Sequence, residues 1–152
     1  MSQKIEEDLF TFFNEVGIIH QLTSTRFNRV LPAGLRVMQF SVPNHMVRLG
    51  DGKSPLSLAE AFQVTKAGMT HTLSSLAEKK MVEIKPNPKD GRGKLVYLTE
   101  KGEKNRNLAI RELAGDLQFL SERIDFEVLE KSLALLTEIR QVLDKNRGES
   151  QS

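Results

Sequence analysis

Most of the chain consists of stretches in which apolar residues recur every three or four positions, as they do along one face of an α-helix. Residues 5–30 form the first stretch, and Pro32 and Gly34 then interrupt it. A second helix is predicted over residues 35–49. Because proline cannot donate a helical hydrogen bond, Pro43 predicts either a kink in this helix or a late start.

The middle of the chain predicts two helices separated by a very short turn. Ser57 and Glu60 have the spacing of a capping box, so a helix is expected to start at Ser57, after an extended segment, and to end near Phe62. Thr65 is a good N-cap residue for the next helix, which is expected to cover residues 66–80.

Two strand-like segments follow this pair of helices. Residues 82–85 and 95–98 both contain β-branched residues and are predicted to pair as a hairpin. The intervening residues 86–94 include two prolines and two glycines, and the pair Asp90–Gly91 predicts the turn at the hairpin tip.

The last third of the chain is predicted to be helical. Thr99 is expected to cap a helix that reaches about Ser121, and Asp125 is expected to cap a final helix that reaches about Asn146. Residues 147–152 are expected to form a flexible tail.

The helices at the two ends of the chain carry long apolar stripes. These stripes could pack only within one chain, but two long helical segments around a small lobe have more apolar surface than the lobe can cover. Residues 5–30 and 99–146 are therefore expected to form a homodimer. The residues expected at its interface are Leu9, Phe12, Leu117, Leu129, Leu136 and Leu143.

The order helix, short turn, helix and hairpin is typical of a winged helix-turn-helix domain, a mainly α fold with a small β-hairpin wing. Residues 1–146 are predicted to form one such domain, with residues 54–98 as its DNA-binding lobe. The second helix of the pair needs an apolar face that holds it and a polar face that contacts the major groove. Met69, Leu73 and Leu76 supply the apolar face at helical spacing.

The distribution of charge supports contact with DNA. The whole chain has a net charge of only +2, whereas residues 65–98 contain seven basic and three acidic residues, a local charge of +4. Arg92 at the hairpin tip could enter a narrow minor groove. The residues expected to contact DNA are Thr65, Lys66, Gly68, Thr70, His71, Ser74, Lys89, Arg92 and Lys94.

Several stretches of the chain resemble the MarR family of winged-helix regulators. They are residues 56–62, residues 64–80, and residues 88–92 followed by residues 98–102. The last two combine an Asp-x-Arg element in the predicted wing with a Leu-Thr-x-x-Gly start of the next helix. This combination is the most specific part of the resemblance, which extends over nearly the whole chain.

The resemblance implies a homodimer, formed by the first and last helices, that binds a pseudo-palindromic operator. It places Arg92 on the family's wing arginine and Asp90 on its partner acid. Because family members often respond to small aromatic or phenolic ligands, a ligand-responsive repressor is expected. The candidate pocket residues are His20, Phe27, Met38, Phe40, His45 and Met46, all of which could equally be ordinary core or surface residues.

The chain departs from the family pattern at three positions. Met81 stands where the family usually has a glycine before the wing, and His71 stands where a basic or amide side chain is common. Both affect the expected details of DNA contact. Pro43, within the second helix, affects the expected shape of the pocket.

Other classes of function have little support in the sequence. Cysteine is absent, which excludes disulfides and thiol redox sensing, and with three histidines no metal site or cofactor is expected. Common catalytic motifs do not occur, so no catalytic residue is assigned and no enzyme is expected. No apolar run approaches the roughly 20 residues of a membrane span, and a cytoplasmic protein is expected. The alternative is a winged-helix protein-interaction module without DNA sequence specificity.

Overall fold

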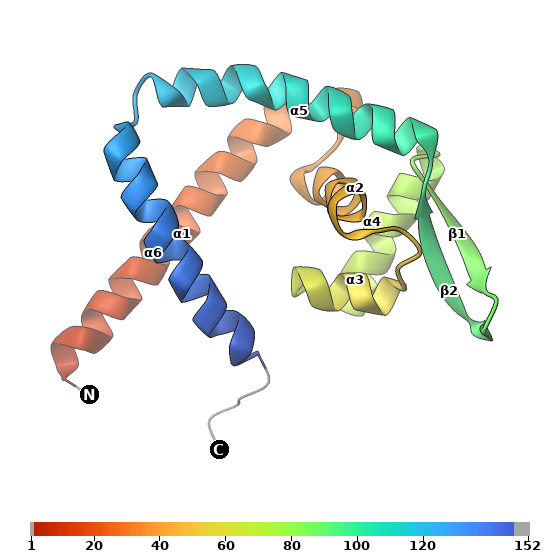
Figure 1. Cartoon of the computed structure of the whole chain (residues 1–152), viewed down its shortest axis with the longest axis horizontal. Coiled ribbons are helices and arrows are strands. Elements are labelled where there is room, and N and C mark those ends of the chain that lie inside the picture. The colour runs from red at the N-terminus through yellow and green to blue at the C-terminus, as the bar shows by residue number, and fades with distance from the viewer. Residues whose placement is uncertain (1, 148–152) are drawn as a thin grey trace. The chain divides into compact units, whose positions relative to one another are not determined.

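The computed structural model describes residues 2–147 and is mainly helical, with one β-hairpin (Figure 1). The elements in chain order are α1 (Gln3–Val30), η1 (Pro32–Gly34), α2 (Val37–Leu49), α3 (Pro55–Phe62), α4 (Lys66–Glu78), β1 (Val82–Asn87), β2 (Asp90–Leu98), α5 (Glu100–Ser121) and α6 (Phe126–Lys145). The predicted fold class is confirmed. Of the tail predicted over residues 147–152, all but Arg147 lies outside the described residues.

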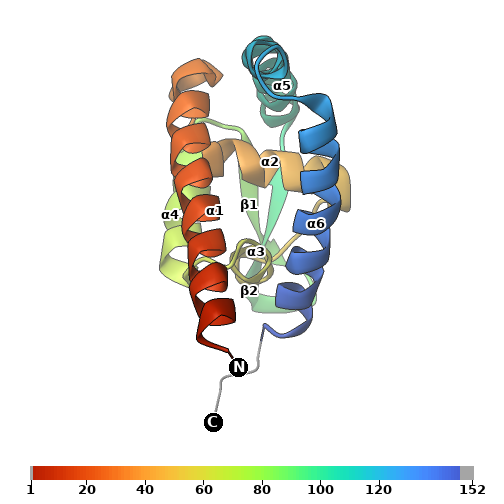
Figure 2. The same cartoon turned by 90° about the vertical axis from the view of Figure 1, so that its left-hand side faces the viewer.

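The contacts within the chain define two compact units, residues 1–114 and residues 115–152, and the boundary falls inside α5. The first unit holds α1 to α4, the hairpin and the first part of α5. Within this unit α2 and α3 cross each other. Figure 1 shows α3 from the side, and Figure 2 shows α3 end-on with α2 running across the view. None of the helices in the described part of the chain combines the length and hydropathy that a membrane span needs.

A single apolar core fills the first unit. Most of its side chains come from α2, α3, α4, both strands and α5, and partly buried residues such as Phe27 and Val30 at the end of α1 pack against it. The buried members are Leu31, Leu35, Val42, Met46, Leu58, Ala59, Met69, Leu73, Leu76, Met81, Val82, Val96, Ala109 and Leu113.

The helix before the short turn begins earlier than the sequence predicted. Ser54, not Ser57, is the N-cap of α3, because its hydroxyl accepts a hydrogen bond from the backbone N–H of Ser57 (3.0 Å). Pro55 occupies the first helical position, where its fixed φ suits a helix and its missing N–H costs nothing. The extended segment expected before Ser57 is therefore wrong. Pro55 is the first residue of α3.

The hairpin also differs from the prediction, since its strands are longer and its turn is tighter. Pro86 is paired with Lys94, and Asn87 is paired with Asp90, so the turn is only two residues long. The side chain of Asn87 accepts a hydrogen bond from the Lys89 N–H (3.0 Å) and stabilises this turn. The predicted turn at Asp90–Gly91 is wrong, because both residues belong to β2.

Helix α2 continues through Pro43, which lies inside it and is buried. The helix starts at Val37, six residues earlier, so the alternative of a late start at the proline is wrong. The start is held by side chains instead. Asn28 of α1 accepts a hydrogen bond from the Val37 N–H (2.8 Å), and Gln39 accepts one from the Arg36 N–H (3.0 Å).

The end of α4, the base of the hairpin and the start of α5 meet at one junction. Thr99 donates its backbone N–H to the Met81 carbonyl (3.1 Å) and its hydroxyl to the Lys80 carbonyl (2.7 Å). The same hydroxyl accepts a hydrogen bond from the Gly102 N–H (3.0 Å), which confirms Thr99 as the cap of α5. Lys80 has a φ of 58°, so it ends α4 in the left-handed conformation that glycine usually adopts.

Long apolar faces remain uncovered on the terminal helices. Neither α1 nor α6 contributes a buried residue to the chain. Leu9 is 46% exposed on α1, Leu117 is 52% exposed on α5, and Leu136 is 43% exposed on α6. These faces include the residues that the sequence assigns to a dimer interface.

Replacement of Gly102 by alanine should destabilise the chain. A Cβ atom at Gly102 would overlap the carbonyl oxygen of Met81 and lie 2.7 Å from Leu98 Cδ1, so the two backbones would have to separate. We expect the free energy of unfolding to fall by about 2–3 kcal/mol in urea denaturation. In the matched control, Gly115→Ala on the same helix, the new Cβ meets nothing within 4 Å. This control should gain up to about 1 kcal/mol, and equal effects of the two changes would contradict the close contact.

Candidate nucleic-acid interface

Helix α4 has the two faces that the sequence predicted. Met69, Leu73 and Leu76 are buried in the core and hold the helix against α2, α3 and β1. Thr65 caps the helix, because its hydroxyl accepts a hydrogen bond from the Gly68 N–H (3.0 Å). The first helical turn leaves the N–H groups of Lys66 and Ala67 without intrahelical acceptors, so they can bind an anion.

All of the residues predicted to contact DNA are exposed. Those on α4 and at its cap lie on the side opposite the buried residues, and the others lie on the hairpin. They are Thr65, Lys66, Gly68, Thr70, His71, Ser74, Lys89, Arg92 and Lys94. Their exposure makes contact with a large ligand possible, and their role in DNA binding stays a prediction.

A groove of about 540 Å³ lies between α4 and the hairpin, and it is called the helix–wing groove below. One side is formed by Lys66, Thr70 and Ser74 of α4, and the other side includes Arg92 and Lys94 of β2. Five of the predicted contact residues therefore line a single concave surface. The remaining lining residues are Ser54, Pro55, Leu56, Leu73, Ile84, Asn87, Asp90 and Gly93.

The predicted residues outside this groove have different surroundings. Thr65 and Gly68 bond to each other in the helix cap, so their polar groups are already engaged. His71 is exposed on α4, and Lys89 lies in the turn of the hairpin. Among the basic residues of the lobe, Lys85 is paired with Glu83 (2.9 Å).

Sequence reasoning missed the residues that hold the hairpin in place. Lys53 forms a β-bridge with Val96, whose N–H donates to the Lys53 carbonyl (2.8 Å). The carboxylate of Asp51 accepts a hydrogen bond from the Leu98 N–H (3.0 Å). These contacts fix the base of the hairpin, and hence the width of the helix–wing groove. The partners lie more than forty positions apart along the chain, so no local pattern indicates them.

Ser54, Pro55 and Leu56 at the start of α3 were also missed as residues of the helix–wing groove. Their signal was present in the sequence. A serine followed by a proline is a common helix start, and this start would have placed the first turn of α3 beside the groove.

Comparison with known proteins shows which fold this is. No protein-family model matches the chain. A mutant MarR from E. coli in complex with operator DNA is 25% identical, with a TM-score of 0.75 over 87% of this chain and 95% of that chain. The regulator BldR from Sulfolobus solfataricus is 25% identical, with a TM-score of 0.74 over 90% of this chain and 99% of that chain. The chain is similar in fold and sequence to MarR-family transcriptional regulators.

More distant MarR-family structures share only the fold. PcaV from Streptomyces coelicolor, solved in complex with its natural ligand, is 19% identical, with a TM-score of 0.70 over 85% of this chain and 89% of that chain. In this winged helix-turn-helix fold α4 is the second helix of the helix-turn-helix and the β1–β2 hairpin is the wing. The chain is thus a winged-helix protein of a class that regulates transcription by binding DNA.

The six residues predicted for a ligand pocket lie in different environments. Phe27, Met38 and Phe40 pack against the core, and Met46 is one of its buried members. His20 is exposed on α1, and the His45 ring lies 5.2 Å from the Phe62 ring. Most of the aromatic and methionine residues are therefore part of the packing of the lobe.

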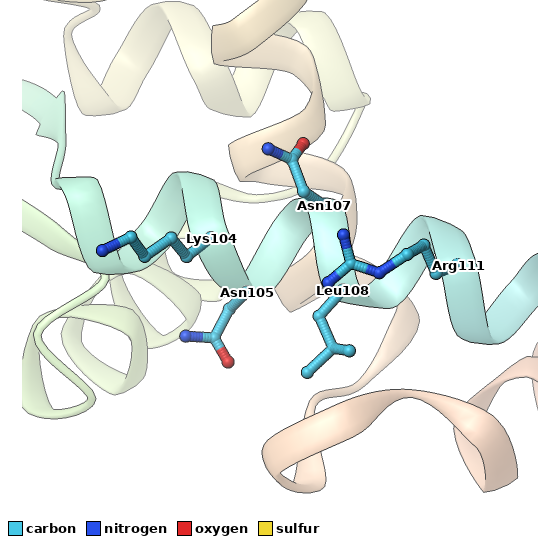
Figure 3. Close-up of a pocket in the computed structure, with 5 residues that line it drawn as sticks. All are labelled: Lys104, Asn105, Asn107, Leu108 and Arg111. Carbon is cyan, nitrogen blue, oxygen red and sulfur yellow. The ribbon is translucent and has the colours of Figure 1, made fainter.

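The surface has two further hollows, and one of them includes a predicted pocket residue. One, of about 380 Å³, is lined only by Lys104, Asn105, Asn107, Leu108 and Arg111 of α5, whose side chains are drawn in Figure 3. It has no aromatic lining. The other, of about 420 Å³, includes Met46 together with Asp51, Glu100 and Glu103, and its carboxylates would repel an anionic ligand. Within the described residues, no cluster of three or more His, Asp or Glu side chains could hold a metal ion.

His45 should make the stability of the fold depend on pH. Partial burial lowers the pKa of His45 below its ordinary value of 6.5, and the charges of Lys53 and Arg48 lower this pKa further. As the pH falls below about 6.5, the unfolded chain takes up a proton that the folded chain does not, so the free energy of unfolding decreases. We expect His45→Gln to reduce the loss of stability between about pH 7.5 and about pH 5 in urea denaturation.

The control for this change is His20→Gln, since His20 is exposed on α1. This variant retains His45, so it should lose as much stability in acid as the wild type does. An identical pH dependence in the wild type and in His45→Gln would show that His45 makes no contribution.

Proposed function

We propose that the chain is a homodimeric transcriptional repressor that binds a pseudo-palindromic operator and responds to a small ligand. The observation that supports this function best is the helix–wing groove. It is lined by basic and short polar side chains from α4 and β2, namely Lys66, Thr70, Ser74, Arg92 and Lys94. A duplex presents a major groove with a phosphate backbone on either side of it. Helix α4 can contact the groove while strand β2 contacts the backbone.

In the proposed complex α4 enters the major groove, and the wing contacts the adjacent backbone. The N–H groups of Lys66 and Ala67 at the start of α4 donate to a phosphate, aided by the positive end of the helix dipole. Lys94 and Arg92 neutralise phosphates on the other side of the helix–wing groove. Residues 54–98 act as the DNA-binding lobe of one functional domain that extends over residues 1–146.

Dimerisation is supported by the uncovered apolar faces of α1 and α6. Predicted interface residues on these helices remain accessible in the chain: Leu129 is 42% exposed, and Leu143 is 55% exposed. Soluble proteins rarely leave such long apolar faces in water. In a two-fold dimer the two α4 helices would lie about 34 Å apart, one turn of B-DNA.

A change in the spacing of the two lobes would provide regulation. A small aromatic or phenolic effector would bind one spacing of the lobes more tightly than the other. The ratio of its affinities for the two spacings would set how far it changes the affinity for DNA. We propose repression as the outcome, because a dimer bound over a promoter excludes other proteins. A regulator of this kind acts in the cytoplasm, where bacterial and archaeal DNA is found.

Replacement of Arg92 should test the contact between the wing and DNA. In Arg92→Ala each dimer loses two cationic side chains, so the slope of log K against log salt concentration should become shallower by about two units. At moderate salt the affinity for a mixed pool of duplex fragments should fall about tenfold or more. Lys145→Ala, an exposed cation on α6, is the matched control and should change neither quantity.

Fluorescence anisotropy across a salt series measures both quantities. An unchanged slope in Arg92→Ala would refute the assignment of the wing. If the wild type itself showed no salt-sensitive binding at low ionic strength, the alternative of a protein-interaction module would be favoured.

Replacement of Leu136 by glutamate should test the dimer. The change places a carboxylate on the apolar face of α6, and burying this charge between two subunits would cost several kcal/mol. Sedimentation velocity should show a monomer for Leu136→Glu and a dimer for the wild type. Gln141→Glu adds the same charge on the polar face of α6 and should remain dimeric. A dimeric Leu136→Glu would refute this interface.

A further inference from the structure

The surface that α4 offers to a duplex is made of small and short side chains. The exposed residues on its outer side are Lys66, Ala67, Gly68, Thr70, His71, Ser74 and, in the last turn, Glu78. Lys66, Thr70 and Ser74 line the helix–wing groove, and Ala67 lies one turn from His71 on the next row of the helix. The outer side of α4 therefore consists of few chemical groups, and each can be considered in turn.

Several hydroxyl groups near this surface are engaged within the protein. Thr65 accepts the Gly68 N–H in the helix cap, and Thr72 donates its hydroxyl to the Gly68 carbonyl (3.1 Å). The Ser75 hydroxyl accepts a hydrogen bond from the Gln39 side chain of α2 (2.8 Å). These side chains stabilise α4 and its attachment to α2. The polar side chains that face outward are then Lys66, Thr70, His71 and Ser74, together with Glu78 in the last turn of the helix.

The outward face of α4 contains no arginine, asparagine or glutamine. Arginine and lysine form paired hydrogen bonds with guanine in the major groove, and asparagine and glutamine form them with adenine, so Lys66 is the one side chain of this face that can make such a contact. The nearest amide before the helix, Gln63, donates its side-chain N–H to the Glu60 carbonyl (2.6 Å). The amide oxygen of Asn87 in the wing accepts the Lys89 N–H. Two-point recognition of purines is thus poorly supplied on this surface.

The same face does supply methyl groups. The Ala67 Cβ and the Thr70 Cγ2 stand three residues apart on the helix, and thus on neighbouring positions of its surface. Thymine is the only base that presents a methyl group in the major groove, and alanine and threonine methyls are suitable contacts for it. Because the surrounding side chains are short, the helix can approach the base edges closely enough for such contacts.

We propose that Ala67 and Thr70 determine specificity by contacting the C5-methyl groups of thymines, so that the preferred half-site places thymines in the major groove opposite α4. This proposal rests on the proposed DNA-binding function and adds the chemical feature of the duplex that the helix distinguishes. Lys66 and the helix–wing groove contribute affinity to any sequence, whereas the two methyl groups contribute the preference.

The test begins with selection of bound duplexes from a random-sequence pool by the full-length dimer. Each thymine of the selected half-site is then replaced by deoxyuridine, which removes only the C5-methyl group. At each contacted thymine the Kd should rise about fourfold, the value expected for one buried methyl group. Replacement of each guanine by 7-deazaguanine, which removes the N7 acceptor, should change the Kd less than about twofold, since Lys66, the one side chain of α4 suited to guanine, is assigned to the phosphate backbone.

Variants of Thr70 connect the preference to this residue. Thr70→Ser keeps the hydroxyl and removes the methyl group, so it should bind thymine and deoxyuridine equally well at one position of the half-site. Thr70→Val keeps a methyl group and is the matched control, in which the preference for thymine at that position should persist. Equal discrimination in Thr70→Ser and in the wild type would overturn the assignment to Thr70.

The outcomes separate this inference from the proposed function. Salt-sensitive binding that tolerates deoxyuridine throughout, but is lost with 7-deazaguanine, would overturn the inference and leave DNA binding intact. Absence of salt-sensitive binding to any duplex in the pool would overturn the proposed function itself. The result that we expect is a loss confined to deoxyuridine at one or two thymines of each half-site, which Thr70→Ser abolishes at one of these positions.

Discussion

The contact between Gly102 and the Met81 carbonyl is the constraint on which the DNA-binding half of the structure depends. At this point Met81, which connects α4 to the wing, and the first turn of α5 meet without space for a Cβ atom. Thr99 joins the three segments through the carbonyls of Lys80 and Met81. Since α4 and the wing are the two sides of the helix–wing groove, a small shift at this junction would change the groove.

Much of this arrangement could be predicted from the sequence, because it depends on local chemistry. Thr65, Thr99 and Asp125 are N-caps whose side chains accept backbone N–H groups within the next three residues. The apolar spacing of Met69 and Leu73 determines which face of α4 is buried. Local chemistry also explains the error at Ser57. Two serines compete for the role of cap, and the proline after Ser54 decides between them by fitting the first helical turn.

The rest depends on contacts between distant parts of the chain, which no local pattern contains. Asp51 and Lys53 hold the base of the wing through the backbone of Leu98 and Val96. The candidate ligand residues illustrate the same difficulty. Aromatic and methionine side chains at helical spacing suit a pocket and a core equally well, and only the packing shows that Phe27 and Met46 belong to the core.

The composition of α4 connects the DNA-binding lobe to the apolar faces of the terminal helices. Short side chains allow close approach, but they supply few cations, so one lobe offers little more than Lys66, Lys94, Arg92 and Lys89 to a phosphate backbone. A single lobe should therefore bind DNA weakly. In the proposed dimer, two lobes would bind a two-fold site far more tightly, because the second lobe would bind at a high effective concentration. Because each lobe binds weakly, the DNA affinity of the dimer would depend strongly on the spacing of its lobes. A regulatory ligand would act by changing this spacing.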